Sequence, residues 1–286
     1  MTDHIENFGR YMTAERRCST ATVDIYTRDL RSFEAYWLAS GGEGDEQGHL
    51  APEAVRLEDV RGWVMQDVEA GTATGSVNRR ISTLRSFFRY LMRQGVVEQN
   101  PVRDIKALRS GRRLPAFVDR NRMTQLVRVL EEPSEEFAVE RDAMVVLLLY
   151  ACGLRRSELA SLTLGNLDLA ERTLRVMGKG AKERVVPLLP AVAERLEHYL
   201  QVRAEEKICA DGENFLFLSN KGHGLSAMGV YTIVRSYLSL AGVQGKRSPH
   251  VLRHTFATHL MQHGASIRVV QQLLGHASLA ATQIYT

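Results

Sequence analysis

Six side chains in the second half of this chain have the types needed to break and rejoin a phosphodiester bond without a metal ion. They are two arginines, two histidines, a lysine and a tyrosine, at Arg155, Lys179, His250, Arg253, His276 and Tyr285. Positioned cations stabilise the charge that builds on the non-bridging oxygens, and an arginine fork does so with two hydrogen bonds. A tyrosine hydroxyl can act as the nucleophile. The sequence therefore predicts a site for metal-free phosphoryl transfer.

The first arginine of this set has a carboxylate close by in the sequence. Arg155 follows Cys152-Gly153-Leu154 at the end of an apolar segment, which is an unusual place for two adjacent arginines. Arg156 is its rival for a role in binding phosphate. Glu158 lies three residues after Arg155, and side chains at i and i+3 share a helix face. We therefore expect Glu158 to orient Arg155.

The second arginine lies near a predicted helix start. In Ser248-Pro249-His250-Val251-Leu252-Arg253, the serine can cap the helix and the proline fits its first position. A helix N-terminus attracts phosphate through its free N–H groups and its positive dipole end. His250 and Arg253 are three residues apart and face the same way, so both are expected at one phosphate.

Four histidines in this region also allow a different hypothesis, a metal site. His250 and His254 have the i, i+4 spacing of zinc-binding helices, and His259 and His263 follow. However, Val251 stands where such helices carry a glutamate, and no nearby Asp, Glu or Cys supplies a further ligand. We therefore expect no metal and no cofactor.

In this order and spacing, the six side chains resemble the tyrosine recombinase (phage integrase) family, and most closely its Xer branch. The resemblance covers nearly the whole chain and is sharpest from Arg155 to Thr286. The segments that carry it are Gly153-Leu154-Arg155-Arg156-Ser157-Glu158-Leu159, Gly178-Lys179-Gly180-Ala181-Lys182-Glu183-Arg184, His250-Val251-Leu252-Arg253 and Leu274-Gly275-His276-Ala277-Ser278.

The resemblance implies a role for each of these side chains. Tyr285 is the nucleophile, and its attack gives a covalent phosphotyrosine that stores the bond energy for rejoining, so that no ATP is needed. Arg155, rather than Arg156, acts with Arg253 on the non-bridging oxygens of the phosphate. His276, which follows a predicted helix end at a glycine, donates a hydrogen bond to one of these oxygens.

A predicted hairpin turn, Gly178-Lys179-Gly180, presents a lysine. The resemblance implies that Lys179 protonates the leaving 5′ oxygen. Lys182 is on the same turn, and either lysine could instead contact phosphate. A tyrosine pKa of about 10 means that the nucleophile needs help from nearby cations and from His250 as a base. The competing tyrosines, which lack an adjacent cationic cluster in sequence, are Tyr199, Tyr231 and Tyr237.

Apolar periodicity predicts a mainly α fold with a small, short antiparallel β-sheet. Apolar residues recur at steps of three and four from Val23 to Trp37, and a continuous apolar run from 143 to 154 predicts a buried helix. The other helices are expected at 57–69, 76–94, 123–130 and 191–203, with three more after Ser226. Strands are expected at 174–177 and 184–188, and a third short strand at 214–218.

The helix expected at 76–94 carries five arginines and no acidic residue. At 100° per residue, Arg79, Arg89 and Arg93 fall opposite its apolar stripe, with Arg80 and Arg85 on the flanks. A surface of one charge sign favours contact with DNA phosphates, whereas a solvated face more often mixes signs. We therefore predict DNA contacts from Arg79, Arg80, Arg85, Arg89 and, in the second half, Lys182.

The chain is expected to form two domains joined by a basic linker. The segment between Pro101 and Pro115 contains five basic residues and one aspartate, which predicts an extended segment that could lie against a duplex. The resemblance implies an all-helical core-binding (SAM-like) domain at 1–108, a linker at 109–115 and an α-rich catalytic domain at 116–286. Xer-type relatives usually continue with another helix after the nucleophile, and that tail is absent from this sequence.

Composition is ordinary for a water-soluble globular protein. Of the 286 residues, 44% are apolar and 24% charged, and the formal net charge of +4 permits nucleic-acid binding without demanding it. Three widely spaced cysteines, a polar N-terminus and apolar runs too short to span a bilayer favour a reduced compartment. We expect a cytoplasmic protein with no membrane association.

The function that the resemblance implies is site-specific recombination of double-stranded DNA with paired sites, through a Holliday junction. It also implies a homo- or hetero-tetramer with a related recombinase, a role in chromosome dimer resolution, and a septal DNA translocase as a candidate partner. Compact length without an extra arm-binding domain favours this role over a mobile-element integrase. A type IB topoisomerase and a catalytically silent DNA-binding protein are the remaining alternatives.

Overall fold

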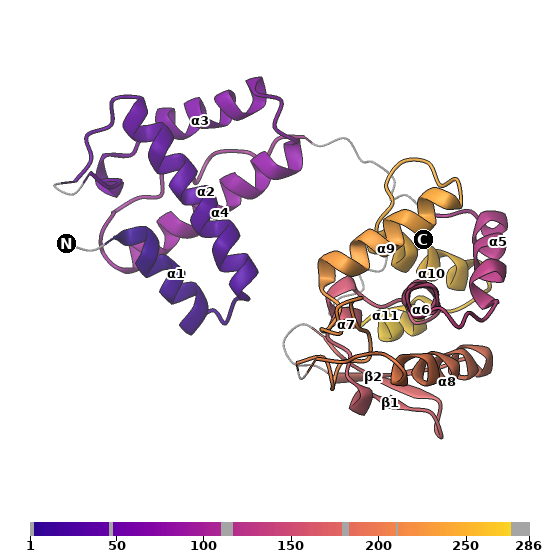
Figure 1. Cartoon of the computed structure of the whole chain (residues 1–286). Helices are drawn as coiled ribbons and strands as arrows, with labels where there is room; N and C mark the ends of the chain where they lie inside the picture. Colours follow the sequence, from indigo (N-terminus) through magenta and orange to yellow (C-terminus); the bar gives the residue numbers. More distant parts are fainter. Residues whose placement is uncertain (1–2, 46–47, 110–116, 179–182, 210, 276–286) are drawn as a thin grey trace. The chain divides into compact units, whose positions relative to one another are not determined.

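The chain divides into two units, Met1–Arg113 and Leu114–Thr286, each with its own apolar core (Figure 1). The computed structural model describes residues 3–45, 48–109, 117–178, 183–209 and 211–275. Both units are mainly helical, and the second also contains a small antiparallel sheet. The predicted fold class is therefore confirmed.

The described part of the first unit is a helical bundle. Its elements are α1 (His4–Ala14), α2 (Thr20–Ala39), the 3-10 turn η1 (Pro52–Ala54), α3 (Leu57–Glu69) and α4 (Thr74–Arg93). The expected stripe on α2 is buried at Leu30, Phe33 and Trp37 and half-buried at its N-terminal end. Aromatic rings dominate the core, where Phe33 meets Trp63 edge-on and Phe8 meets Phe87 in the same way.

Helix α4 follows the predicted apolar stripe closely. Val77, Ile81, Leu84, Phe88 and Leu91 are separated by steps of four and three, and each is at most 1% exposed. Burying side chains of this size contributes about 1.5–3 kcal/mol each relative to leaving them in water. The apolar face thus fixes which side of α4 carries its arginines.

The segment after α4 is packed against the first unit up to residue 108, so it is not extended from Pro101 as expected. Val102 is fully buried. The side-chain amide of Asn78 donates to the Leu108 carbonyl and its oxygen accepts from the Leu108 N–H, at 2.9 and 2.7 Å. Arg85 also donates to the carbonyl of Ile105, at 2.6 Å. These polar contacts with α4, which an apolar pattern cannot reveal, hold the segment in place.

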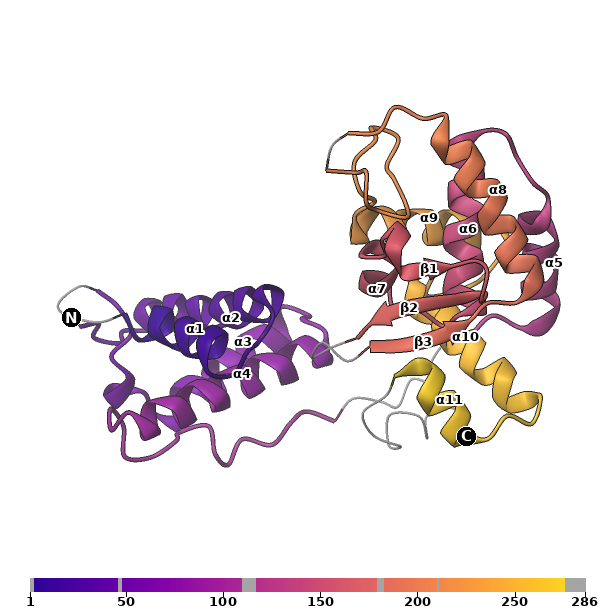
Figure 2. The ribbon, with the colours of Figure 1, turned by 90° about the horizontal axis from the view of Figure 1, so that it is seen from below.

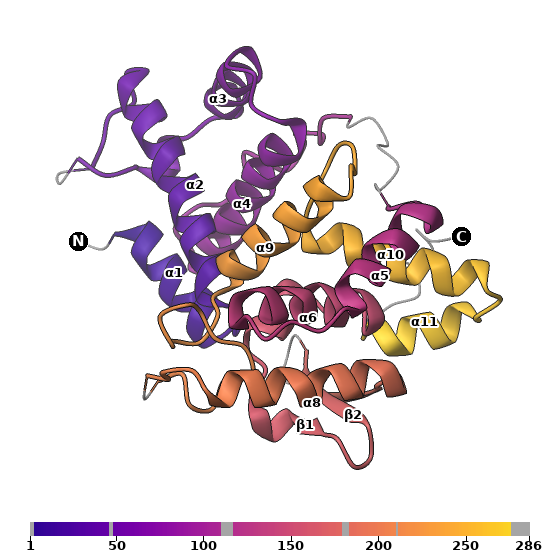
Figure 3. The ribbon, with the colours of Figure 1, turned by 45° about the vertical axis from the view of Figure 1, so that its right-hand side comes forward.

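The second unit is built around one buried helix. Its described elements are α5 (Arg120–Glu131), α6 (Phe137–Ala151), α7 (Arg156–Ala160), η2 (Leu164–Asn166), β1 (Leu167–Asp168), β2 (Thr173–Met177), β3 (Glu183–Pro187), α8 (Pro190–Ala204), α9 (Ala227–Leu240), α10 (Pro249–Gln262) and α11 (Ile267–Leu274). Helix α6 is apolar on all sides from Ala143 to Leu149, as expected of a buried helix. It lies beside α8, and α10 lies beside α11 (Figure 3).

The strands lie side by side in the order β1-β2-β3 and pair antiparallel (Figure 2). Val176 pairs with Arg184 across β2 and β3. The third strand is β1, and the strand expected at 214–218 is wrong. That segment makes single bridges, Thr163 with Phe215 and Leu218 with Gly224, because its backbone pairs with the loop after α7 and with the loop that follows it, instead of with the sheet.

The described residues contain no helix that is both long and apolar enough to cross a membrane.

A left-handed glycine links α6 to the residues that follow it. Gly153 has φ +59°, a conformation that glycine adopts without the strain of a Cβ. A Cβ placed there would lie 2.4 Å from Cδ1 of Phe256, on α10. The close approach brings the carbonyl of Gly153 to the guanidinium of Arg253, 2.5 Å away.

Gly153→Ala is therefore expected to destabilise the second unit by about 2–3 kcal/mol, because it adds both backbone strain and overpacking. Native-state hydrogen exchange of the α6 amides would measure this loss in that unit alone. Gly165→Ala is the matched control, since a Cβ there meets nothing nearer than 3.9 Å. Equal protection of α6 in the two variants would contradict the expected strain at Gly153.

Candidate active site

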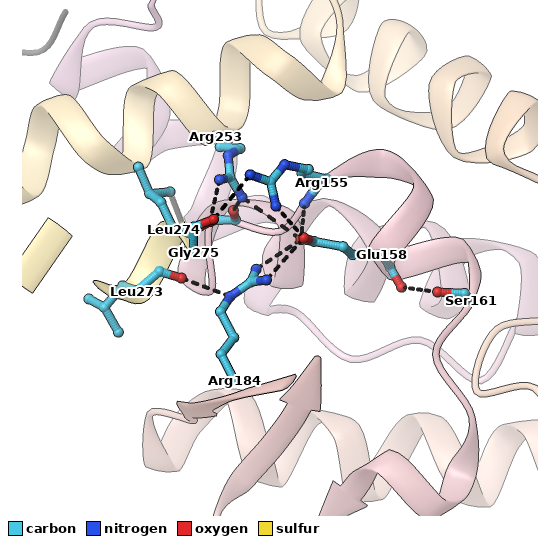
Figure 4. A network of polar contacts seen from close by, with 9 residues as sticks. Arg155, Glu158, Ser161, Arg184, Arg253, Leu273, Leu274 and Gly275 are labelled. Carbon is cyan, nitrogen blue, oxygen red and sulfur yellow. Dashed lines mark hydrogen bonds and ion pairs between the residues drawn. The ribbon is translucent and has the colours of Figure 1, made fainter. Parts of the chain in front are cut away.

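One carboxylate lies at the centre of a cluster of arginines from three separate elements. Glu158 on α7 accepts hydrogen bonds from Arg155 at 2.6 Å and from both terminal nitrogens of Arg184 at 2.8 and 2.9 Å (Figure 4). The Nη1 of Arg253 lies 3.8 Å from the same carboxylate. Glu158 is 5% exposed. The structure therefore brings the predicted pair Arg155 and Arg253 together, with Arg184 as a third cation.

Glu158 orients Arg155 by a different geometry from the expected one. Arg155 is the N-cap of α7, with extended backbone angles, so the two residues do not share a helix face. Instead, the Glu158 carboxylate accepts from the backbone N–H of Arg155, at 2.8 Å, as well as from its guanidinium. A carboxylate three residues into a helix satisfies the N-cap N–H in this way. Both the backbone and the side chain of Arg155 are thus fixed by one partner.

The pKa of Glu158 records this arrangement. Burial by itself would raise the pKa, but the hydrogen bonds and charge of Arg184 and the two hydrogen bonds from Arg155 lower it from 4.5 to about 2. Glu158 is therefore ionised at neutral pH. With three guanidinium groups around one carboxylate, the cluster has a formal charge of +2, which suits a phosphodiester anion.

The same three arginines hold the C-terminal end of α11. Arg184 Nε donates to the Leu273 carbonyl at 3.0 Å, Arg253 Nη2 to Leu274 at 2.5 Å and Arg155 Nη2 to Gly275 at 3.4 Å (Figure 4). The last carbonyls of a helix lack partners within the helix and form the negative end of its dipole, so cations stabilise them.

The predicted helix start before Arg253 is present, with a difference at its cap. Ser248 is the N-cap of α10 and Pro249 takes its first position, but the serine side chain makes no capping hydrogen bond; its carbonyl accepts from the Val251 N–H instead. Arg253 is buried in the second turn. Partial burial, followed by the charges of Arg156, Arg253 and Arg155, lowers the pKa of His250. The lowered pKa favours the neutral imidazole, which is the form that a base requires.

Gly275 ends α11 in the left-handed conformation expected of it, at φ 61°. Residues 179–182 and 276–286 lie outside the described residues, and with them the predicted Lys179, Lys182, His276 and Tyr285. Of the competing tyrosines, Tyr199 is fully buried, donates to the Leu216 carbonyl at 3.0 Å, and has a pKa raised by burial. Partial burial also raises the pKa of Tyr237.

Within the described residues, one group of His, Cys, Asp and Glu side chains is close enough to share a metal ion. It consists of Cys209, Asp211 and His223, on loops after α8. None of the four histidines considered above belongs to this group. The hydrogen bond of 2.8 Å between Asp211 and His223 accounts for the approach of those two side chains. In contrast, His259 of α10 is buried and lies 3.0 Å from the Tyr150 hydroxyl.

The arginine face of α4 differs from the surface of one sign expected from the sequence. Arg79 forms two hydrogen bonds to Asp29, at 2.9 and 3.0 Å, and Arg80 pairs with Asp67 and Asp29. The guanidinium of Arg85 donates to a backbone carbonyl. Arg89 is exposed. DNA contact stays a prediction for all four, and the first three also hold the fold of the first unit together.

Sequence reasoning missed Arg184. It ends the segment Gly178-Lys179-Gly180-Ala181-Lys182-Glu183-Arg184, in which a role was predicted for the two lysines and none for the arginine. Alternation along β3 could have found it, since Arg184 and Val186 point to the same side of the sheet and Val186 is buried. A charge on the inner face of a strand requires a partner.

Three arginines at one carboxylate give a mainly helical unit a cluster of net positive charge, which is suited to binding a phosphodiester. Residues 117–286 match the phage integrase family, and residues 5–95 match the N-terminal SAM-like domain of phage integrases. The chain belongs to the phage integrase family, whose members include the tyrosine recombinases.

Named relatives agree with this assignment, and a solved structure shares the fold. The chain is 39% identical to the tyrosine recombinase XerC of Thermodesulfovibrio yellowstonii, over 99% of this chain and 91% of the relative. It is 36% identical to the tyrosine recombinase XerD of Listeria monocytogenes, over 100% of this chain and 94% of the relative. The fold is similar to that of the XerH site-specific recombinase bound to its palindromic difH substrate, with TM-score 0.76 and 21% identity over 99% of this chain and 80% of that one.

The lowered pKa of Glu158 predicts a pH-dependent contribution to stability. A carboxylate with a folded pKa of about 2 and an ordinary value of 4.5 contributes about 3 kcal/mol at neutral pH. Glu158→Gln is expected to lose this amount, and the difference from the wild type should shrink as the pH falls from 4.5 through 2. Urea denaturation followed by circular dichroism over a pH series measures it.

Glu171→Gln, which changes an exposed carboxylate between β1 and β2, is the control. Its difference from the wild type is expected to stay near zero throughout. A deficit for Glu158→Gln that is independent of pH would show that lost packing, and not lost charge, causes the destabilisation.

Proposed function

We propose that this chain is a site-specific recombinase that cuts and rejoins DNA through a 3′-phosphotyrosine intermediate and a Holliday junction. The observation that supports this most directly is the convergence of Arg155 and Arg253 on Glu158, within residues 117–286 that match the phage integrase family. The same range of the sequence also contains Lys179, His276 and Tyr285. Arg155 is the most exposed of the three clustered arginines, at 31% of its side chain, and is best placed to meet a phosphate from solvent.

The proposed reaction is one phosphoryl transfer and its reversal. The hydroxyl oxygen of Tyr285 attacks the scissile phosphorus, and the bond to the 5′ oxygen breaks. The tyrosine proton passes to His250, and Lys179 gives a proton to the departing 5′ oxygen. Rejoining occurs when a 5′ hydroxyl from the partner strand attacks the phosphotyrosine. Arg155, Arg253 and His276 stabilise the charge on the non-bridging oxygens in both directions.

Neither a metal nor ATP takes part in this scheme. The formal charge of +2 on the arginine cluster supplies the stabilisation that a divalent cation would otherwise give. The covalent phosphotyrosine retains the energy of the broken bond, because one phosphodiester is exchanged for another.

The two units have separate tasks in this proposal. The first, at 1–108, is a core-binding domain that contacts DNA through the exposed side of α4, and the second, at 116–286, is the catalytic domain. The basic residues of the linker at 109–115 add phosphate contacts between them. Two domains joined in this way can hold a duplex from opposite sides.

Two paired sites require four active sites, so we infer a tetramer, built from this chain alone or with a related recombinase. Relatives named XerC and XerD match at 39% and 36% identity, which favours a cytoplasmic role in chromosome dimer resolution, with a septal DNA translocase as a candidate partner. Exchange of strands between two labelled duplexes separates this function from that of a type IB topoisomerase, which relaxes DNA without exchanging strands.

A nicked suicide substrate with recombination sites tests the nucleophile. The wild type is expected to form a protein–DNA adduct that survives SDS with EDTA present, and Tyr285→Phe is expected to form none, because the hydroxyl that attacks phosphorus is gone. Gel electrophoresis of the labelled DNA measures the adduct. Tyr231→Phe is the control and should react like the wild type.

An adduct with Tyr285→Phe would show that another residue attacks the phosphate. An adduct that disappears with EDTA would contradict the metal-free scheme. Tight DNA binding without any adduct from the wild type would favour the catalytically silent alternative.

The salt dependence of DNA affinity tests the arginine face of α4. Arg89→Ala is expected to reduce the slope of log affinity against log salt by about 1, as the loss of one phosphate contact does. Fluorescence anisotropy of labelled duplex across a salt series measures the slope. Arg10→Ala, which removes an exposed arginine from α1, controls for the change in net charge. Equal slopes for these two variants would rule out a specific contact by Arg89.

A further inference from the structure

Arg184 joins the sheet to Glu158 and to the C-terminal end of α11. It lies at the second position of β3, opposite the buried Val176. From there its guanidinium reaches Glu158 with two terminal nitrogens and the carbonyl of Leu273 with Nε (Figure 4). Three of the five N–H donors of one guanidinium therefore connect β3, α7 and α11.

We propose that Arg184 is a positioning residue for strand cleavage, which acts through Glu158 to set the place of Arg155 and through Leu273 to set the end of α11. This inference rests on the proposed function and deepens it. Arg184 need not touch DNA in this role, and its side chain is 11% exposed.

The bidentate contact explains why an arginine suits this position. The planar fork of Arg184 matches both oxygens of the Glu158 carboxylate, so it fixes the rotation of that carboxylate as well as its place. Held in this way, the Glu158 carboxylate accepts from the guanidinium of Arg155 with one oxygen and from the backbone N–H of Arg155 with the other. A lysine could supply the charge and hydrogen bonds, but not the planar pair of donors that matches both carboxylate oxygens at once.

Charge balance gives Arg184 a second effect on Arg155. Arg155 and Arg184 share the single negative charge of Glu158. Each guanidinium is therefore held less strongly by that carboxylate than it would be as the sole partner. Without Arg184, the formal charge of the cluster falls from +2 to +1, and Arg155 becomes the main counter-ion of a buried Glu158. Arg155 would then be held toward Glu158 and away from a phosphate.

The position of Arg184 also connects the hairpin to the cluster. It is two residues after Lys182 and five after Lys179 in the sequence. Arg184 thus anchors β3 at its second residue, close to the start of the strand. An anchor on the neighbouring outward position could not serve, since Val185 is 56% exposed.

Cleavage of a nicked suicide substrate at saturating enzyme is the test, with Arg184→Met and Arg184→Lys beside Arg175→Met. Arg175 lies on β2 with its side chain exposed, so it is the matched control. Arg184→Met is expected to cleave about 100-fold more slowly, the loss that a misplacement of about 1 Å can cause. Arg184→Lys should cleave faster than Arg184→Met but more slowly than the wild type. Arg175→Met should cleave at the wild-type rate.

Two further readouts separate positioning from folding and from DNA binding. The dissociation constant for the duplex is expected to change less than about twofold in Arg184→Met, because a positioning residue makes no phosphate contact that the substitution could remove. The double variant Arg184→Met with Glu158→Gln should lose less than the product of the two single losses, because the part of the effect that runs through Glu158 is shared and only the contact with Leu273 is lost in addition. Losses that multiply in the double variant would overturn the inference.

Three other results would also overturn it: wild-type cleavage by Arg184→Met, an equal loss in Arg175→Met, or a fall in DNA affinity that accounts for the whole effect. If Arg184→Met proves unfolded by circular dichroism, the comparison of Arg184→Lys with the wild type decides in its place, and an unchanged rate there overturns the inference. Absence of any adduct from the wild type would instead be a failure of the proposed recombinase function.

Discussion

The geometry of the candidate site depends on one buried carboxylate. A charge removed from water is costly unless it is fully paired, and Glu158 meets that demand with hydrogen bonds from Arg155 and Arg184. The arginines in turn find acceptors at the end of α11, whose last carbonyls would otherwise lack partners. Each group satisfies a requirement of another, so the position of any one of them is set by the rest.

Packing supports this cluster from outside. The buried α6 provides the centre against which α8, α9 and α10 pack, and Gly153, just after the helix, presents its carbonyl to Arg253. The sheet contributes through its inner face, where Val176 and Val186 are buried and Arg184 is the charged neighbour. The site is thus held by the most buried parts of the second unit, which limits how far its guanidiniums can move.

Local patterns in the sequence predicted much of the fold and part of the site. Steps of three and four located α4 and its buried face, and the proline after Ser248 located the start of α10. Contacts between distant residues were beyond such patterns: the pairing of Arg79 with Asp29 spans 50 positions, and Arg184 reaches Glu158 across 26. Nothing in the spacing of like residues encodes which opposite charge will lie nearby after folding.

The sequence separation of the cluster's contacts has a consequence for how the active chain arises. Arg253 reaches Gly153 across 100 positions, and Arg155 reaches Gly275 across 120. Contacts of such high separation require the closing of long loops, and so does the packing of α6 against α10, which joins residues about as far apart in the sequence. The arginine cluster is therefore expected to assemble together with the core of the second unit, and not on a partly folded chain.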